Sequence, residues 1–390
     1  MLFQTIDTKS GCKNFYVQNS FTEDLTSFRG KRILTWKKSP SLDDIEVDYA
    51  WLMSGGKELE SFENPALSEY KHKLKAWHKS FITAKVDLSD NCFFDLIPEK
   101  VLVEYYEQLN KLCQNVDDNF EKNNMYYHLR DCHELLESIA ANVVNTNMDS
   151  FRKSVSSKND ISLMNKLADK KNICYNLFGT KTGRLTTKKN SFPILTLAKK
   201  FRSCIEPNND LLLEFDLNSA EARTFLNLIG ADINEDIHSY NSEYIFEDTN
   251  RDEAKVKFFS WLYDLNKKNP ALEREYDRES IIGEFYRDGN IETPFGRKIK
   301  CPREKVINYS LQSITNDVVL EGAAKVRELL KNKRSNVYFL LHDSIVLDFC
   351  REDVNIIPDI LEVFKGTKVG SYDLNIRSGN DFGTMREIKI

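Results

Sequence analysis

The sequence predicts an α+β fold in which an antiparallel sheet is combined with long helices. A run of five residues at 211–215 is almost entirely apolar and is followed by Asp216, which indicates a buried strand. Two further apolar runs lie within 337–349 and are separated by a polar tip, a pattern typical of a β-hairpin. Apolar residues at helical spacing predict long helices between residues 98 and 145.

The first ~85 residues predict a small mixed α/β unit with a strand at 32–36. A helix should follow Pro98, since proline is well tolerated in a first helical turn. A second helix carries apolar residues between Leu135 and Val143. We expect these two helices to form a long antiparallel pair.

Capping residues mark the starts of two later helices. Asn218 or Ser219 can cap a helix that reaches about Leu228, and Thr249 or Asn250 can cap an amphipathic helix over 249–264. The remaining predicted elements are helices at 308–330 and 356–364 and a strand at 372–376.

Length and composition exclude several classes of protein. The chain has 390 residues, of which 41% are hydrophobic and 29% charged, so two or three modules with sizeable cores are expected. Apolar runs are far shorter than the ~18 residues of a membrane helix, and residues 1–15 do not resemble a signal peptide. The eight cysteines include no CxxC pair. We therefore expect reduced thiols, no membrane partner and a cytoplasmic protein.

The net charge of −5 argues against a general nucleic-acid coat, but the charge is unevenly distributed. The segment 180–205 has no acidic residue and contains seven basic ones: Lys181, Arg184, Lys188, Lys189, Lys199, Lys200 and Arg202. It is either a solvated loop or a strip that follows a phosphate backbone.

Two aspartates are placed at the ends of predicted strands. Asp216 follows the apolar run 211–215, and Asp343 lies between the two strands of the hairpin. Either aspartate alone is a common turn or cap residue. Together at one sheet edge they suit Mg²⁺, which takes one or two protein carboxylates plus substrate phosphates. Two such ions can activate a hydroxyl and stabilise a leaving pyrophosphate.

The predicted helix at 251–263 carries Arg251, Lys255, Phe259 and Tyr263 at intervals of four residues. Each interval advances about 6 Å along the axis, so the four side chains form one slowly drifting stripe. Two cations followed by two aromatic rings suit a nucleoside triphosphate. A surface helix with a basic edge and an aromatic core face would show the same pattern.

These segments resemble motifs of the DNA polymerase I family (family A). Residues 216–223 (DLNSAEAR) resemble its motif A, 251–263 (RDEAKVKFFSWLY) its motif B, and 341–344 (LHDS) its motif C. Residues 182–185 (TGRL) and 307–312 (INYSLQ) are similar to two further elements, and Gly296-Arg297 and 380–383 (NDFG) also fall in order. The resemblance covers about residues 85–390.

The resemblance implies a right-hand polymerase, with an antiparallel palm sheet, a helical thumb and helical fingers. Its expected parts are a small N-terminal unit of unknown role at 1–85, a thumb-like region at 86–180, palm at 181–237, shortened fingers at 238–300, and palm again at 301–390. The implied activity is template-directed DNA synthesis: dNTPs are added to a primer 3′-hydroxyl by two-metal phosphoryl transfer, without intrinsic proofreading.

The resemblance also implies a role for individual residues. Asp216, Asp343 and the carbonyl of Leu217 would bind two Mg²⁺ ions. Arg251, Lys255, Phe259, Tyr263 and Glu221 would bind the dNTP, with Lys255 also assisting pyrophosphate departure and Glu221 excluding a 2′-hydroxyl. Primer–template DNA would be contacted by Arg184, Arg202, Asn308, Gln312 and His342.

Other interpretations remain open. Many family members have Glu where Ser344 stands, and Ser in this place resembles single-subunit phage-type RNA polymerases, whereas Glu221 favours DNA synthesis. A catalytically inactive nucleic-acid-binding subunit is a third possibility. The N-terminal Asp44-Ile45-Glu46 is expected to be a solvated turn and no nuclease site. A separate exonuclease, helicase or processivity factor is a possible partner. The resemblance also implies the cytoplasm of a bacterial or phage-infected cell.

Overall fold

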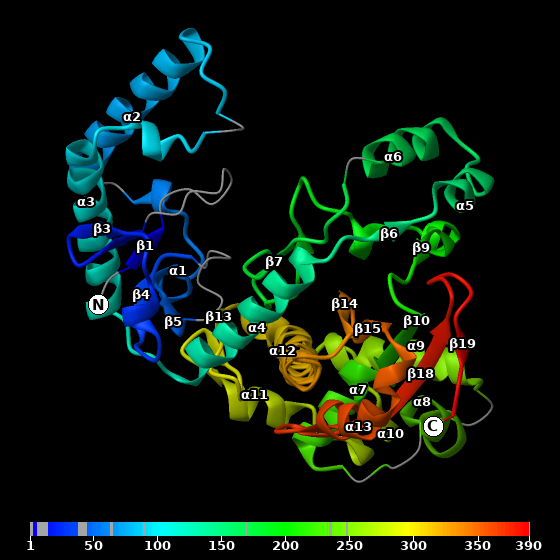
Figure 1. Cartoon of the computed structure of the whole chain (residues 1–390). Coiled ribbons are helices and arrows are strands. Elements are labelled where there is room, and N and C mark those ends of the chain that lie inside the picture. Colours follow the sequence, from blue (N-terminus) through cyan, green and yellow to red (C-terminus); the bar gives the residue numbers. More distant parts are fainter. Residues whose placement is uncertain are drawn as a thin grey trace. The chain divides into compact units, whose positions relative to one another are not determined.

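The computed structural model describes residues 3–5, 15–37, 45–62, 65–88, 91–168, 170–231, 233, 236–246 and 249–389. The chain divides into two compact units, Met1–Tyr126 and Tyr127–Ile390, whose elements are labelled in Figure 1. Both units combine helices with strands, as the sequence predicts.

Unit 1 is built from short strands and helices. Strands β1 (Phe3–Thr5), β2 (Phe15–Val17) and β3 (Ser20–Thr22) form an antiparallel sheet, and β4 (Ile33–Thr35) pairs in parallel with β5 (Val47–Tyr49). Strand β4 confirms the strand expected at 32–36. The helices are α1 (Ala50–Met53), α2 (Pro65–Thr83) and α3 (Glu99–Asp118).

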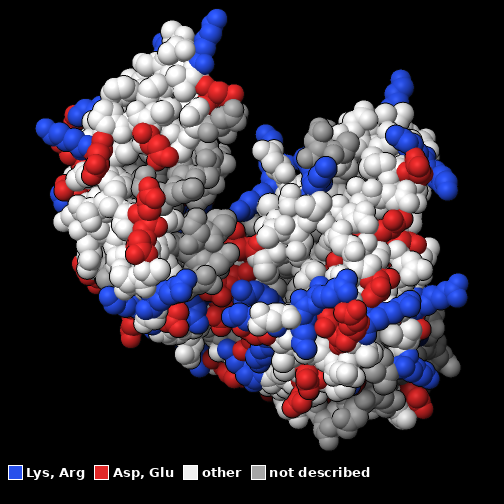
Figure 2. All heavy atoms as spheres, in the orientation of Figure 1, with Lys and Arg blue, Asp and Glu red and all other residues white. Residues whose placement is uncertain are grey.

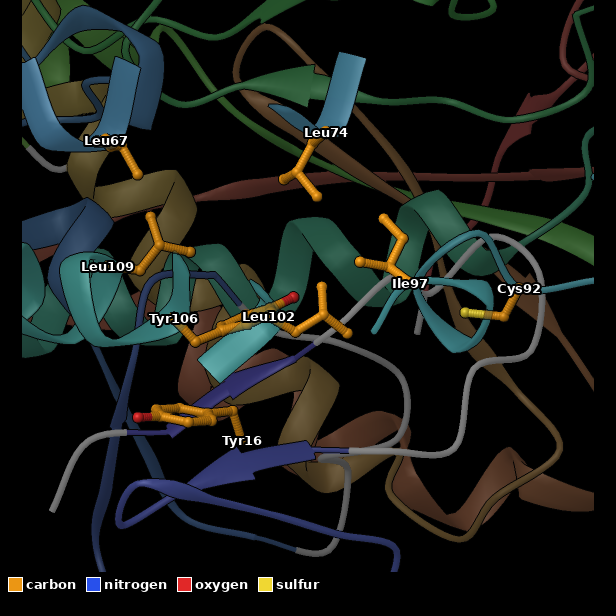
Figure 3. Close-up of a cluster of buried hydrophobic side chains, with 8 residues drawn as sticks. All are labelled: Tyr16, Leu67, Leu74, Cys92, Ile97, Leu102, Tyr106 and Leu109. Atoms are coloured by element: carbon orange, nitrogen blue, oxygen red, sulfur yellow. The ribbon is translucent and has the colours of Figure 1, made fainter. Parts of the chain in front are cut away.

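The apolar face of α3 forms the centre of the unit 1 core. Its buried residues include Leu102, Tyr106 and Leu109, which lie at helical spacing beside Leu67 and Leu74 of α2 (Figure 3). We expected this face to lie in a long antiparallel pair with the following helix. The α3 apolar face packs against α2, and most of α4 (Asn124–Ala141) belongs to unit 2.

The cysteines differ in part from expectation. Cys92 is disulfide-bonded, so the prediction of reduced thiols throughout is wrong for this residue. The other cysteines among the described residues, Cys113, Cys132, Cys174, Cys204, Cys301 and Cys350, carry free thiols. Cys12 lies outside the described residues, as do Asp43 and Asp44 of the acidic N-terminal segment.

The centre of unit 2 is an antiparallel sheet in the order β14-β15-β10-β18-β19. Its strands are β10 (Leu211–Leu217), β14 (Asn336–Leu341), β15 (Ser344–Phe349), β18 (Leu374–Gly379) and β19 (Arg386–Glu387). Strand β10 confirms the predicted buried strand, and β14 and β15 confirm the hairpin. Because β10 pairs with β15 on one side and β18 on the other, its carboxyl end lies at the hairpin turn.

The long helix α12 (Val306–Leu329) packs against β14, β15 and several other helices of unit 2. Most of its residues are buried, as expected for a helix inside a core. The other helices are α5 (Met148–Lys153), α6 (Lys158–Ala168), α7 (Ala220–Ile229), α8 (Ile237–Tyr240), α9 (Arg251–Tyr263), α10 (Pro270–Glu275), α11 (Glu279–Phe285) and α13 (Ile357–Lys365).

Short strand pairs complete unit 2. They are β6 (Asn145–Thr146) with β9 (Ile205–Glu206), β7 (Tyr175–Asn176) with β8 (Thr186–Thr187), β11 (Tyr286–Arg287) with β12 (Asn290–Glu292), β12 with β13 (Lys298–Lys300), and β16 (Gly366–Thr367) with β17 (Gly370–Ser371).

Two helix starts test the predicted caps. The Asn250 side chain accepts a hydrogen bond from the Glu253 N–H at 3.0 Å, which confirms its capping of α9. Ser219 precedes α7 but its side chain makes no capping bond, because its backbone has φ +47 rather than the extended conformation of a capping residue. The expectation of a side-chain cap on α7 from Ser219 is therefore wrong.

Candidate active site

The central sheet brings Asp216 and Asp343 together. Asp216 of β10 is in register with Ser344, the first residue of β15. The backbone N–H of the next residue, Leu217, donates to the carbonyl of Asp343 at 3.1 Å. His342 and Asp343 form the tight turn between β14 and β15, with φ +53 at His342. Two carboxylates far apart in sequence thus meet at one point of the sheet.

Burial and neighbouring charge disfavour ionisation of these carboxyl groups. Burial raises the pKa of Asp343 to about 6, with further contributions from Glu221 and Asp216, while Arg184 opposes the shift. Burial also raises the pKa of Asp216, against a hydrogen bond at 3.4 Å from the Asn375 amide. A cation placed here would stabilise both ionised forms.

The donor set is compatible with Mg²⁺ and substrate phosphates together. Among the described residues, no group of three or more His, Cys, Asp or Glu side chains converges on a metal site. A pair of carboxylates is nevertheless what Mg²⁺ commonly takes from a protein when phosphates and water supply the remaining ligands. Asp216, Asp343 and the Leu217 carbonyl therefore fit this ion in the presence of a nucleotide.

Glu221 lies in the first turn of α7 and is held by two other elements. The hydroxyl of Tyr263 on α9 donates to one carboxylate oxygen, and the Arg184 guanidinium pairs with the other. The Glu221 side chain is 16% exposed. Burial, followed by the charge of Glu221, raises the pKa of the Tyr263 hydroxyl, so this group remains a donor.

The partners of Glu221 are not its neighbours in the sequence. Tyr263 comes from α9 and Arg184 from the basic strip at 180–205. Arg223, two residues further along α7, donates to the carbonyl of Ile233 and lies 3.8 Å from Asp373. The ion pair between Arg184 and Glu221 joins two predicted site residues. We expected Arg184 to contact primer–template DNA and Glu221 to contact the dNTP.

The stripe on α9 forms as the four-residue spacing predicts, but its members differ in environment. The Arg251 guanidinium makes two hydrogen bonds to Asp236, at 3.0 and 2.9 Å. Lys255 is exposed and makes no ion pair or hydrogen bond with any other described residue. Phe259 stacks on Tyr263 with ring centroids 5.6 Å apart and an interplanar angle of 19°. The cationic part of the stripe is thus accessible and the aromatic part is packed.

His238 of α8 is a buried histidine beside the α9 stripe, and the sequence did not single it out as a site residue. Its ring is fully buried and lies 5.5 Å from the Phe259 ring, and neither ring nitrogen has a hydrogen-bond partner in the described part of the chain. Burial lowers its pKa to about 4, and Lys255 and Arg251 contribute in the same direction against Asp236. The sequence gives a single histidine without companion ligands, which carries no signal by itself.

A polar stripe on α12 includes two predicted DNA-binding residues. Asn308, Gln312 and Asn316 lie at intervals of four residues and are half-buried. The Asn316 amide donates to the carbonyl of Gly183 at 3.0 Å. Arg184 therefore comes directly after a residue whose backbone carbonyl is hydrogen-bonded to α12.

Gly183 is required by its surroundings. Its φ is +83, and a Cβ atom would lie 2.5 Å from the central carbon of the Arg297 guanidinium. Arg297 in turn donates to the fully buried Asp317 at 2.9 and 2.6 Å, and His128 lies 3.2 Å from the same carboxylate. Burial raises the pKa of Asp317, but Arg297 and His128 outweigh it and hold that pKa low. This network fixes the segment that carries Arg184.

His342 directly precedes Asp343, and Arg202 lies close enough to His342 for its charge to act on the ring. Burial lowers the pKa of His342, with Arg184 and Arg202 contributing. The Arg202 guanidinium lies over the Phe382 ring, 5.0 Å from its centroid.

The basic side chains of the strip at 180–205 are exposed, except for that of the half-buried Arg202. Among the described residues, Arg184 and Lys200 are its only members that form ion pairs with carboxylates. On the face shown in Figure 2, basic and acidic side chains are interspersed, in keeping with the small net charge. The strip is thus a local feature and no part of a general basic coat.

Comparison with known proteins finds a similarity among solved structures and none among family models or curated proteins. No family model matches the sequence, and no curated protein matches it. Among solved structures, the chain is similar to the POL domain of Pol1 from M. smegmatis in complex with DNA primer-template and dNTP, with a TM-score of 0.48 and 14% identity. The match covers 82% of this chain and 66% of that chain, just under two thirds. Within the described residues, no helix has both the length and the apolar character needed to cross a bilayer.

Proposed function

We propose that the chain is a template-directed DNA polymerase that adds dNTPs to a primer 3′-hydroxyl by two-metal phosphoryl transfer. The observation that carries the proposal is the meeting of Asp216 and Asp343, joined through the hydrogen bond from the Leu217 N–H to the Asp343 carbonyl. Beside them, Tyr263 and Arg184 fix a third carboxylate, Glu221.

Asp216 and Asp343, with the Leu217 carbonyl, would hold the two Mg²⁺ ions. When bound, such ions lower the pKa of an attacking hydroxyl and neutralise charge on the leaving pyrophosphate. The protein orients the reactants, and most of the rate enhancement comes from this positioning and from charge stabilisation.

The α9 stripe would bind the incoming nucleotide. Lys255 is exposed, and in this proposal it would meet the triphosphate and give a proton to the pyrophosphate. Arg251 keeps its orientation through Asp236 and adds a second cation. Phe259 would border the sugar, while Glu221, held by Tyr263, would occupy the space that a 2′-hydroxyl needs.

The remaining predicted residues would contact primer–template DNA. Arg184 and Gln312 suit minor-groove acceptors, which are similar for all correct base pairs. Asn308, one turn earlier on α12, would face the template, and His342 in the hairpin turn would support the primer end. Arg202 would meet a backbone phosphate.

Ser344 favours a second candidate, an RNA polymerase with the same arrangement, because Ser follows the motif C aspartate in phage-type enzymes. The two functions differ in the nucleotide they accept. Primer extension with separate dNTP and rNTP pools decides between them, and an inactive nucleic-acid-binding subunit would bind the duplex but extend with neither pool.

Substitution of the aspartates tests the proposed site. Asp216→Ala and Asp343→Ala should each reduce primer extension by at least about 10³-fold and change duplex affinity by less than about threefold, because charge stabilisation of the transition state is lost while phosphate contacts remain. Asp359→Ala, which removes an exposed carboxylate on α13, is the matched control and should extend normally. Substantial extension by Asp343→Ala in Mg²⁺ would exclude this site.

A further inference from the structure

A buried carboxylate close to Asp216 has no role in the proposed mechanism. Glu214 of β10 is 2% exposed and lies two residues before Asp216. Since side chains alternate along a strand, Glu214 and Asp216 lie on the same face of the sheet, about 7 Å apart along β10. A charged residue in the middle of a central strand needs partners, because an unpaired buried charge is strongly destabilising.

Glu214 has partners on both neighbouring strands. The Ser344 hydroxyl on β15 donates to Glu214 Oε1 at 3.0 Å. On the other side, Arg377 of β18 is directly in register with Glu214 and forms an ion pair with Oε2. Burial raises the pKa of Glu214, and Arg377 and Ser344 counteract the shift. Glu214 is thereby connected to the residue that follows Asp343.

Arg377 is the accessible end of this arrangement. Its side chain is 41% exposed while the Glu214 side chain is 2% exposed, so the pair presents a guanidinium to solvent. Arg377 lies on the same face as Asp216, one strand away, and its positive charge opposes the rise that burial causes in the pKa of Asp216. Adjacent strands are about 4.8 Å apart, and the register offsets the two residues by two positions, about 7 Å along the strands, so their backbones lie about 8 Å apart.

A second guanidinium is nearby. Burial lowers the pKa of Arg202, and Arg377 adds to this shift while Glu214 opposes it. The cross-strand neighbour of Arg377 on β19 is the exposed Glu387, with which Arg377 forms no ion pair in the described part of the chain. Arg377 is thus ion-paired with Glu214, and Arg202 lies near enough to both for their charges to act on its pKa.

We propose that Glu214 is a positioning residue that holds Arg377 on the sheet face to bind a backbone phosphodiester of the primer strand. This inference rests on the proposed function. With the primer 3′-hydroxyl at Asp216 and Asp343, the exposed Arg377 guanidinium on the same face of the sheet is available to a phosphate of the same strand. The guanidinium is planar and has donors to spare for a second bidentate partner, and its orientation by Glu214 reduces the ordering cost of binding.

Salt dependence of DNA affinity provides a test that a purely structural role would not affect. Binding of a labelled primer–template is measured by fluorescence anisotropy at 50–200 mM salt. Arg377→Ala should weaken binding by about tenfold. It should also reduce the slope of log affinity against log salt by about 0.9, because one phosphate contact is lost. Under steady-state conditions the KM for DNA should rise, with the KM for dNTP unchanged.

Two further variants and a control complete the experiment. Arg377→Ala leaves Glu214 buried and unpaired, so Glu214→Gln/Arg377→Gln, which removes both charges, should fold and show the same loss of slope. Glu214→Gln alone should weaken DNA binding less than Arg377→Ala, because the cation remains but is no longer fixed. Arg386→Ala removes an equivalent charge from the opposite face of the sheet and should keep the wild-type slope.

The outcomes separate the two proposals. If the double variant keeps the wild-type slope and affinity, or if Arg386→Ala lowers the slope equally, the phosphate contact at Arg377 is excluded while the polymerase function stands. If the wild-type chain neither binds nor extends a primer–template, the proposed function itself fails.

Discussion

At the scale of single residues, Glu221 shows how a side chain acquires a fixed position. Its carboxylate accepts from Tyr263 and pairs with Arg184, so three segments of the chain meet at one group. Steric exclusion by a fixed group can discriminate more strongly than one missing hydrogen bond.

We therefore predict strong preference for dNTPs over rNTPs. Glu221→Ala should relax the preference by at least about tenfold and also weaken dNTP use. Tyr263→Phe should relax it less, because Arg184 still holds the carboxylate. The ratio of kcat/KM for matched dNTP and rNTP measures both effects. Equal use of the two nucleotides by the wild-type chain would instead favour the RNA polymerase interpretation.

Protonation of Asp343 should affect both the activity and the stability of the protein. Its pKa is raised to about 6 in the folded chain, above that of an unfolded aspartate, so the folded state binds the proton more tightly. Without metal, the contribution of Asp343 to the free energy of unfolding should fall as pH rises from about 4 to about 6, and stay low above that range. Because protons compete with Mg²⁺ for this carboxylate, extension at limiting Mg²⁺ should fall below about pH 6, and a higher Mg²⁺ concentration should move the fall to lower pH.

Asp343→Asn tests this linkage. The neutral amide lacks the titrating charge, so the variant should have a higher thermal midpoint than the wild-type chain at pH 7–8 without metal, and extension should be abolished. Thermal unfolding over pH 4–8 measures the first effect. A lower midpoint for Asp343→Asn at pH 7–8 would contradict the assigned cause of the shift.

At the scale of elements, regular patterns were predictable where local chemistry and tertiary packing agree. The strand β10, the hairpin and α9 follow from apolar runs and the Asn250 cap. The backbone conformation of Ser219 could not be predicted from local chemistry, because its positive φ is set by the connection between β10 and α7. The partner of α3 also depends on tertiary contacts, and the same apolar face would suit α2 or α4.

Two helical glycines allow the cost of overpacking to be compared with the gain in intrinsic helix propensity. At Gly322 of α12, a Cβ would lie 2.6 Å from the Phe364 ring of α13, whereas at Gly283 of α11 nothing lies within 4 Å. Alanine gains up to about 1 kcal/mol over glycine in a helix, while overpacking costs about 1–3 kcal/mol. Gly283→Ala should therefore stabilise the protein and Gly322→Ala destabilise it.

Urea unfolding of both variants measures the difference. Phe364→Leu combined with Gly322→Ala should recover part of the loss, because the smaller side chain makes room for the methyl group. A stabilising Gly322→Ala would show that α12 and α13 separate easily at this contact.

At the scale of the whole molecule, the sequence placed most of the candidate site but not the contacts that orient it. Asp216, Asp343 and the α9 stripe follow from local spacing. The pairing of Arg184 with Glu221 and of Glu214 with Arg377 joins segments far apart in the chain, and no local pattern encodes it. His238 was missed for the same reason, since its burial arises from packing against α9.

The whole chain should lack editing activity. We expect a mismatched primer 3′ end to persist when the pure protein is incubated with Mg²⁺ and no dNTP, because the N-terminal segment offers no complete set of acidic ligands in its sequence. Gel analysis of the labelled primer measures this. Removal of 3′ nucleotides that is abolished by Glu46→Ala would assign a nuclease site to the N-terminal unit.

The hydrogen bond between the Leu217 N–H and the Asp343 carbonyl has a consequence for insertions into the chain between β10 and β14. The two aspartates meet through strand register, so the length of chain between β10 and β14 does not enter their geometry. Doubling the length of a flexible connection costs only about 0.6 kcal/mol. The turn at Asp288-Gly289, which joins β11 to β12 with positive φ at both residues, is one place in that stretch where a foreign domain can be grafted. The catalytic pair would keep its register in such a fusion.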